Sequence, residues 1–330
     1  MKYIVNNSND AEYNLAFEEY CFTNLPKDED YLILWINGPS IIIGKNQNAR
    51  EEINNKYVEE NNIQVVRRPT GGGAVYHDLG NLNYSIITTS QGERIIDLKK
   101  YNIPIMKALE KLGVESEFSG RNDLVIDGKK FAGIAQSVKR NRVLNHGAML
   151  FDVDLDALTE SLNVREDKYK SKGVKSVRSR VTNIKPYMDD RIGMEEFKDT
   201  LLRTMFEMKK EEPEEYILSE EELKGIDKIY NERYGTWEWN YGYSPDSNFS
   251  NYKRFPFGSI DVRLDIKNGV IDGCKIFGDF FGVEDIQNLE DKLKGERYEK
   301  DHIRTILKEK NLKEYFGDIE LEEFIELLFD

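Results

Sequence analysis

The sequence has few cysteines and few histidines, and these shortages exclude two kinds of structural site. The chain of 330 residues has two cysteines and three histidines, which are Cys21, Cys274, His77, His146 and His302. Two distant cysteines do not make a disulfide framework, so we expect both to be reduced and buried. The cysteines and histidines also lack the spacing of zinc ligands, so we predict no structural zinc site.

Long apolar runs and an excess of basic residues are missing too. No run approaches the roughly 18 apolar residues of a membrane-spanning helix, and the first residues, MKYIVNNSND, include no apolar signal-peptide stretch. We therefore expect a cytoplasmic protein without a membrane partner. The 47 basic residues against 61 acidic ones give a net charge of -14. Because nucleic-acid binders present basic surfaces, we expect no nucleic-acid partner, although a small cationic site is compatible with this balance.

Length and patterning predict two domains, at about 150 residues per domain. Residues 241–250 are rich in Ser, Asn, Asp and Pro, which is typical of a linker. We therefore predict a larger domain over residues 1–245 and a smaller one over residues 246–330. Strand candidates come in pairs between helices, which favours an α+β fold over a strict βαβ repeat. We expect a mixed β-sheet core flanked by helices, followed by a small α+β C-terminal domain.

Apolar spacing and turn residues predict the individual elements. Helices are expected over residues 10–22, 49–61, 101–112, 155–162 and 195–208. Strands are expected over residues 31–36, 41–43, 64–68, 74–77, 82–88 and 144–153. Asp127-Gly128 and Asn268-Gly269 each predict a tight hairpin, because their turn type requires positive φ angles.

The most informative segment is RRPTGGGAVYHD, which covers Arg67–Asp78. Its three glycines, at 71–73, leave a stretch of backbone without side chains that could approach a ligand and direct amide groups at an anion. Arg67 and Arg68 could supply cationic donors for phosphate or carboxylate. A flexible turn beside surface arginines is the alternative. The segment is not a Walker A loop, because no Lys-Ser/Thr pair follows the glycines, and it lacks the dinucleotide-binding spacing.

A second segment, GRNDLVIDGKKFAG, contains a lysine that could face a ligand. Because side chains alternate along a strand, Lys129 and Phe131 should face one way, and Lys130 and Ala132 the other. With Phe131 in the core, Lys130 would lie beside a small residue with room for a ligand; an exposed hairpin lysine is the alternative. On the next strand, a packed, hydrogen-bonded side chain is the plainer interpretation of His146.

A basic segment interrupts the acidic chain further on. Residues 165–180 contain seven basic and two acidic side chains. This composition fits a solvated loop, and it also fits a loop that faces phosphate groups.

These motifs together resemble the lipoate–protein ligase family. RRPTGGGAVYHDLGNLNYS is similar to the signature of the family, and GRNDLVIDGKKFAG, HGAMLFDVDLDAL and KSVRSRVTN resemble its later motifs in the same order. IIIGKNQN resembles the early strand and turn. The C-terminal stretches GSIDVRLDIKNGVID and KIFGDFFG are similar to the small accessory domain of the bacterial enzymes. The chain departs from some relatives at Pro69-Thr70, where they have small polar residues.

The resemblance implies a fold shared with biotin ligases and octanoyltransferases, and it implies a set of site residues. Lys130 matches the essential lysine of the family, and residues 172–183 match a loop that closes over the adenylate. The predicted site for ATP and lipoyl-adenylate consists of Arg68, Gly71, Gly72, Gly73, Ala74, Val75, Tyr76, Asn122, Asp123, Lys130, His146, Arg178 and Arg180. No metal ligands are identified, and Mg²⁺ is expected to bind mainly through the ATP phosphates.

The implied reaction has two steps. Lipoate is activated with ATP to lipoyl-AMP, and the lipoyl group then passes to a lysine of a lipoyl-domain protein. The expected acceptors are E2 subunits of 2-oxoacid dehydrogenases and the glycine cleavage H protein.

Three other functions are compatible with parts of the pattern. A cysteine-dependent octanoyl- or lipoyl-transferase on the same fold would need a cysteine near the pocket strands, and residues 67–183 contain none. A biotin–protein ligase would use the same adenylating chemistry with a different acid pocket. A non-catalytic binding module would have no use for both Lys130 and the glycine loop.

Overall fold

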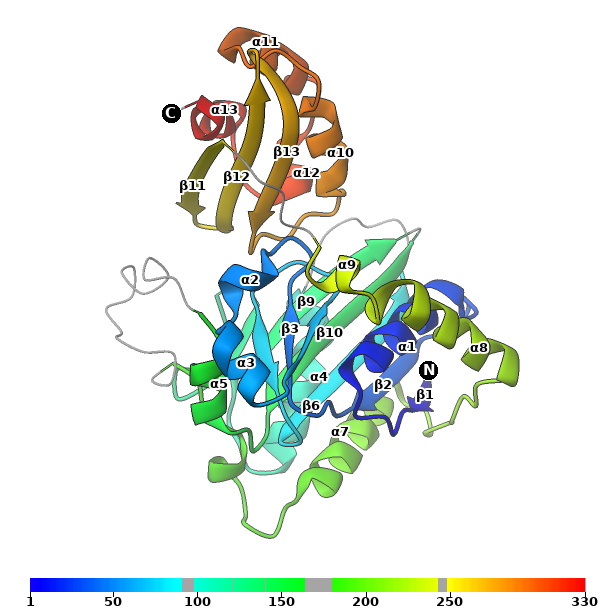
Figure 1. Cartoon of the computed structure of the whole chain (residues 1–330). Coiled ribbons are helices and arrows are strands. Elements are labelled where there is room, and N and C mark those ends of the chain that lie inside the picture. Colours follow the sequence, from blue (N-terminus) through cyan, green and yellow to red (C-terminus); the bar gives the residue numbers. More distant parts are fainter. Residues whose placement is uncertain (91–97, 121, 140, 164–179, 243–247, 330) are drawn as a thin grey trace.

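The computed structural model describes residues 1–90, 98–120, 122–139, 141–163, 180–242 and 248–329. These residues form a larger body, up to residue 242, and a C-terminal body that lies beside its α2 and α9 end (Figure 1). Each has a buried core of its own. The expected α+β class is confirmed.

The larger body is built on a mixed seven-stranded sheet. In spatial order, its strands are β1 (Lys2–Val5), β2 (Tyr31–Trp35), β6 (Asn81–Thr89), β10 (Arg142–Leu150), β9 (Lys129–Lys139), β8 (Asp123–Ile126) and β7 (Glu117–Ser119). The β1–β2 pair is parallel and the other neighbouring pairs are antiparallel. A second sheet has the order β4 (Gln64–Arg67), β3 (Ser40–Ile43) and β5 (Val75–His77).

Helices cover both faces of the large sheet. Those of the larger body are α1 (Ala11–Asn24), α2 (Ala49–Glu52), α3 (Asn55–Glu60), α4 (Leu98–Lys111), α5 (Leu155–Ser161), α7 (Met194–Lys209), α8 (Glu220–Ile229) and α9 (Trp237–Asn240), with the short turns η1 (Lys185–Tyr187) and η2 (Tyr230–Tyr234). The alternation of side chains along each strand separates two cores. Leu32 and Leu34 join the core beneath α4 and α7, whereas Ile33 and Trp35 pack toward α1.

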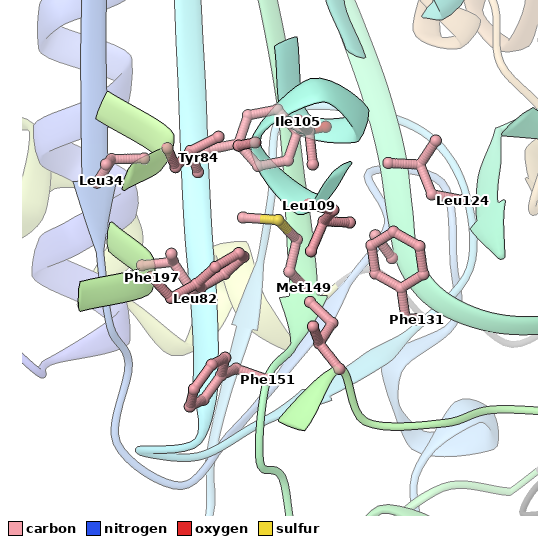
Figure 2. Close-up of a cluster of buried hydrophobic side chains, with 14 of the residues drawn as sticks. Leu34, Leu82, Tyr84, Ile105, Leu109, Leu124, Phe131, Met149, Phe151 and Phe197 are labelled. Carbon is pink, nitrogen blue, oxygen red and sulfur yellow. The ribbon is translucent and has the colours of Figure 1, made fainter. Parts of the chain in front are cut away.

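Figure 2 shows the first of these cores. Ile105 and Leu109 of α4 lie against sheet side chains that include Tyr84, Met149 and Phe131. This layer closes one face of the sheet with apolar contacts, so the opposite face is the one available for a ligand site.

The C-terminal body is a three-stranded antiparallel sheet with four helices. Its elements are β11 (Phe249–Phe255), β12 (Gly258–Lys267), β13 (Val270–Gly278), α10 (Ile286–Leu293), α11 (Lys300–Leu307), α12 (Leu312–Phe316) and α13 (Leu321–Phe329). Its contacts with the larger body include an ion pair between Lys45 Nζ and Asp285 Oδ2, at 3.0 Å. They also include a hydrogen bond in which Gly278 N donates to Asn46 O, at 2.7 Å.

Local turn chemistry is confirmed at both predicted hairpins. Asp127 and Gly128 have φ angles of 50° and 73°, and Asn268 and Gly269 have φ angles of 53° and 76°. Such angles at both central residues are those of the tight turn that suits a right-twisted strand pair.

The single helix expected over residues 49–61 was wrong. The structure divides it into α2 and α3, because Ile53 adopts an extended conformation, is 1% exposed and forms a β-bridge with Leu162. The side chain of Asn54 then caps α3 by accepting a hydrogen bond from Tyr57 N. Burial of one isoleucine therefore breaks a segment that is otherwise helical.

Candidate active site

Four residues in a row across the large sheet line the floor of one pocket, and a fifth, Asp123, ends the row beside it. Trp35 on β2 pairs with Asn83 on β6, which pairs with Ala148 on β10. Ala148 pairs in turn with Gly133 on β9, and Gly133 with Asp123 on β8. Directly opposed residues share one face of a sheet, so these five form a line. The two small residues in its middle leave room above the sheet.

The roof of the pocket comes from the glycine loop and from β5. Gly73, Ala74, Val75 and His77 line the cavity, together with Leu15 of α1. Tyr76 does not, because alternation along β5 turns its side chain into a separate apolar core. Of the predicted site residues, Arg68, Asn122, Lys130 and His146 also line the cavity. Arg178 lies outside the described residues.

The side chain of Lys130 lines the pocket, but its neighbour on the strand differs from the one that strict alternation predicts. A β-bulge shifts the β8–β9 register between Leu124 and Val125, so that Phe131 and Ala132 both enter the core behind the sheet. The small neighbour of Lys130 is therefore Gly133 and not Ala132, which corrects the expectation from the sequence. A Cβ atom on Gly133 would lie 3.2 Å from Lys130 Nζ, so the glycine makes space for the amine.

Asp123 and the segment after the basic stretch hold Lys130 in place. Lys130 Nζ forms an ion pair with Asp123 Oδ1 at 2.7 Å, and both side chains are about one-third exposed (34% and 36%). Lys130 N donates to Arg180 O at 2.7 Å, and Thr182 N donates to Lys130 O at 2.9 Å. Arg180 thus supports the backbone of Lys130, at the point where the chain leaves the basic segment.

Arg68 holds the glycine loop in place by donating hydrogen bonds to its carbonyl oxygens. Its Nη2 donates to Gly71 O at 2.7 Å and to Gly73 O at 2.8 Å, and its Nη1 donates to Ile42 O at 3.1 Å. Burial lowers the pKa of Arg68 to about 10, so the guanidinium stays charged at neutral pH. Arg68 therefore shapes the loop whose backbone faces the cavity.

At two of the three glycine positions, neighbouring atoms leave no room for a side chain. A Cβ atom on Gly71 would lie 2.4 Å from Phe280 O, and one on Gly72 would lie 2.8 Å from both Arg68 Nη2 and Phe281 Cζ. Gly72 also has a φ angle of +93°, which L-residues rarely adopt. Gly73 has no atom within 4 Å of that position and lines the cavity. The C-terminal body thus packs against Gly71 and Gly72, and Gly73 is the glycine that faces the ligand space.

A buried chain of hydrogen bonds, here called the relay, runs from Glu18 through His146 and Thr70 to Arg68. His146 Nδ1 lies 2.8 and 2.9 Å from the two carboxylate oxygens of Glu18, and His146 Nε2 lies 2.7 Å from Thr70 Oγ1. Arg68 Nε donates to the same Thr70 oxygen at 3.1 Å. Ser85 Oγ also donates to Glu18. Since a carboxylate only accepts, Nδ1 of His146 carries a proton, and both ring nitrogens of His146 have hydrogen-bond partners within the protein.

His77 belongs to the pocket, although the sequence analysis did not select it. Its Nδ1 lies 3.0 Å from Asn37 Nδ2. Burial is the main cause that lowers the pKa of His77 to about 3, and the charge of Arg68 and the neighbouring His146 add to it. His77 is therefore neutral at physiological pH. The missed signal was its position two residues after Val75 on a short strand, which places both side chains on the same face.

Arg67 and the two cysteines are not placed for chemistry in the cavity. The Arg67 guanidinium donates to the carbonyl oxygens of Gly44, Lys45, Gln47, Trp239 and Asn240. Cys21 and Cys274 are buried in separate cores, neither lines the cavity, and burial raises the pKa of both thiols. Neither cysteine has the lowered pKa of a nucleophilic thiolate.

Among the described residues, no helix has the length and apolar character that crossing a bilayer requires. The same residues contain no group of three or more His, Cys, Asp or Glu side chains arranged to hold a metal ion.

Two family models match most of the chain. The model of the lipoyl protein ligase A/B catalytic domain matches residues 10–206, and that of the bacterial lipoate protein ligase C-terminus matches residues 244–328. Lipoate-protein ligase LplJ of Bacillus subtilis is 51% identical over 324 residues, which is 98% of each chain. Lipoate–protein ligase 1 of Staphylococcus aureus is 46% identical over 329 residues, covering 99% of this chain and 100% of its own.

Solved structures agree with these matches. P. falciparum LipL1 in complex with lipoate has a TM-score of 0.81 at 26% identity, covering 98% of this chain and 97% of its own. Lipoate-protein ligase A bound with ATP has a TM-score of 0.66 at 28% identity, covering 73% and 98%. A ligase of a bipartite lipoylation system from Thermoplasma acidophilum, described with its E2 lipoyl domain, has a TM-score of 0.67 at 30% identity, covering 75% and 98%. By sequence and by structure, this chain belongs to the lipoate–protein ligase family.

Proposed function

We propose that lipoate lies along the floor row, with its carboxylate at Lys130 and its ring toward Trp35. The observation that carries this proposal is that the two ends of the row differ in chemistry, one charged and the other apolar. A cation lies at the β9 end, small residues line the middle, and Leu15 and Trp35 supply apolar walls at the β2 end. Three strand spacings of about 4.8 Å separate β2 from β9, roughly 14 Å in all, and an extended lipoate spans most of this distance.

ATP then approaches the lipoate carboxylate over Lys130 and the cavity-lining backbone at Gly73. The carboxylate attacks the α-phosphorus, a P–O bond forms, and pyrophosphate leaves. Two anions must meet, so the Lys130 ammonium offsets their repulsion and the negative charge that grows on the phosphoryl oxygens. Mg²⁺, bound mainly through the ATP phosphates, would neutralise the pyrophosphate. In this proposal, Asp123 orients the amine before the substrates arrive.

The second step transfers the acyl group without an enzyme nucleophile. A neutral acceptor lysine attacks the acyl carbon of lipoyl-AMP, a new amide bond forms, and AMP leaves with the bonding electrons. Water would destroy the mixed anhydride, so the site must exclude it. The family resemblance implies this role for residues 172–183, of which 172–179, with Arg178, lie outside the described residues. The E2 lipoyl domain described with the Thermoplasma ligase supports lipoyl-domain acceptors, and we propose E2 subunits and the glycine cleavage H protein.

The remaining assignments follow the geometry. We propose a catalytic domain over residues 1–245 and an accessory domain over residues 246–330, supported by their separate cores. Arg68, Gly73, Ala74, Val75, Asn122, Lys130 and His146 form the adenylate site. Gly71 and Gly72 shape the glycine loop, Asp123 and Arg180 hold Lys130, and Tyr76 packs in the neighbouring core. The cytoplasmic location stays a prediction.

Lipoate-dependent exchange of pyrophosphate into ATP tests the assignment of Lys130. We expect Lys130→Ala to lower exchange by roughly 10²–10³-fold, the effect of removing one fixed electrostatic stabiliser. Lys129→Ala is the matched control, because Lys129 is an exposed lysine on the same hairpin. Near-normal exchange in folded Lys130→Ala would refute the assignment. Parallel assays with lipoate, octanoate and biotin separate the proposed acid from the alternatives.

A further inference from the structure

Three buried N–H groups at the β2 end of the pocket lack a hydrogen-bond partner among the residues that the structure describes. They are Trp35 Nε1, Asn83 Nδ2 and His77 Nε2. The three side chains are only 4%, 3% and 4% exposed, and all line the cavity. A buried donor that makes no hydrogen bond costs about 1–3 kcal/mol, so three together indicate a ligand that accepts from them.

These donors belong to one region of the cavity. Trp35 and Asn83 are directly opposite on β2 and β6, which places their Cβ atoms about 4.5–5.5 Å apart. His77 contacts Asn37, and Asn37 lies two residues beyond Trp35, just past the end of β2. The roof therefore brings His77 to the end of the pocket where Trp35 and Asn83 form the floor.

A chain of asparagines fixes the direction of the His77 donor. Asn6 Nδ2 donates to Asn14 Oδ1 at 2.9 Å, and Asn14 Nδ2 donates to Asn37 Oδ1 at 2.8 Å. Because the oxygen of Asn37 is engaged by Asn14, its amide nitrogen faces His77 Nδ1 and donates to it. His77 is neutral, as its lowered pKa requires, so its single ring proton is on Nε2. That N–H is directed away from the asparagines.

We propose that Trp35, Asn83 and His77 recognise the dithiolane sulfur atoms of lipoate and thereby select lipoate over octanoate. This inference rests on the proposed function, which places the acid at Lys130 and the far end of the substrate at β2. Octanoate has the same carbon chain but carries no acceptor at that end. Divalent sulfur accepts hydrogen bonds weakly, so the selection comes mainly from the cost that octanoate incurs by burying the donors without partners.

The experiment measures kcat/KM for lipoate and for octanoate, with saturating ATP and an acceptor lipoyl domain. Asn83→Leu removes an N–H donor with little change of volume. We expect its kcat/KM to fall for lipoate and to rise for octanoate, so that the lipoate-to-octanoate ratio drops about five- to 20-fold. Trp35→Phe and His77→Leu test the other two donors and cover the case in which Asn83→Leu does not fold. The matched control is Asn145→Leu, a buried asparagine on the opposite face of the sheet from the lining residue His146.

The outcomes separate the inference from the proposed function. An unchanged ratio in all three folded donor variants would overturn the inference. An equal loss for both acids would also overturn it, because the donors would then bind the carboxylate or only support the fold. Ala148→Val narrows the middle of the row and should raise KM for both acids. If that variant left both KM values unchanged, the placement of the substrate on this row would itself be wrong.

Discussion

Glu18→Gln tests whether the buried relay positions the glycine loop. Glu18 is 1% exposed and contacts His146 with both carboxylate oxygens, at 2.8 and 2.9 Å. The substitution keeps the size of the side chain and removes its charge. It therefore weakens the hydrogen bonds to residue 18. It also removes the charge that raises the pKa of buried Arg68 against the effect of burial.

The magnitude follows from these contacts. Hydrogen bonds to a charged group contribute about 1.5–3 kcal/mol, against about 0.5–1.5 for neutral ones. With two contacts to His146 and one to Ser85, we expect the free energy of unfolding to fall by roughly 2–4 kcal/mol. For a body of this size that corresponds to about 4–16 °C in the melting temperature. Because the relay ends on Arg68, which holds Gly71 O and Gly73 O, kcat/KM for ATP should fall as well, by about tenfold.

The assay pairs thermal unfolding with ATP kinetics of the exchange reaction. Glu12→Gln is the control, since Glu12 lies on the same helix and has no contact with the relay. A melting temperature within about 1 °C of the wild type, together with an unchanged KM for ATP, would refute the positioning role. A loss of stability with normal ATP kinetics would restrict the relay to folding.

Two further predictions concern acid stability and the thioester alternative. The folded-state pKa of His77, about 3, lies below its ordinary value of about 6.5, so the unfolded chain binds more protons between these pH values and stability is lost as the pH falls through this window. Between about pH 6.5 and pH 4.5, the free energy of unfolding of His77→Gln should therefore fall by roughly 2 kcal/mol less than that of the wild type. Denaturant titrations at each pH measure this difference, and an equal fall in both proteins would contradict the prediction. Cys21→Ala with Cys274→Ala should keep the rate of lipoyl transfer within about threefold of the wild type, because burial raises the pKa of both thiols away from a reactive thiolate. Abolished transfer in a folded double variant would favour a thioester intermediate.

The sequence by itself determined the features that depend on neighbouring residues. Asp127-Gly128 and Asn268-Gly269 form the predicted hairpins because their φ angles follow from local turn chemistry. Asp10 caps α1 by accepting from Glu12 N and Tyr13 N. The order of the motifs also identified the family, and the family models match on both sides of the predicted boundary.

Tertiary structure decided what depends on residues far apart in the chain. The β8–β9 bulge, and not simple alternation, sets the neighbour of Lys130. Glu18 and His146 are 128 positions apart, and Asn37 and His77 are 40 apart, so no local pattern predicts either contact. Hydrogen-bond direction, tautomer and burial depend on the packing of a helix and two sheets around one cavity, and for that reason they emerge only when the whole chain is folded.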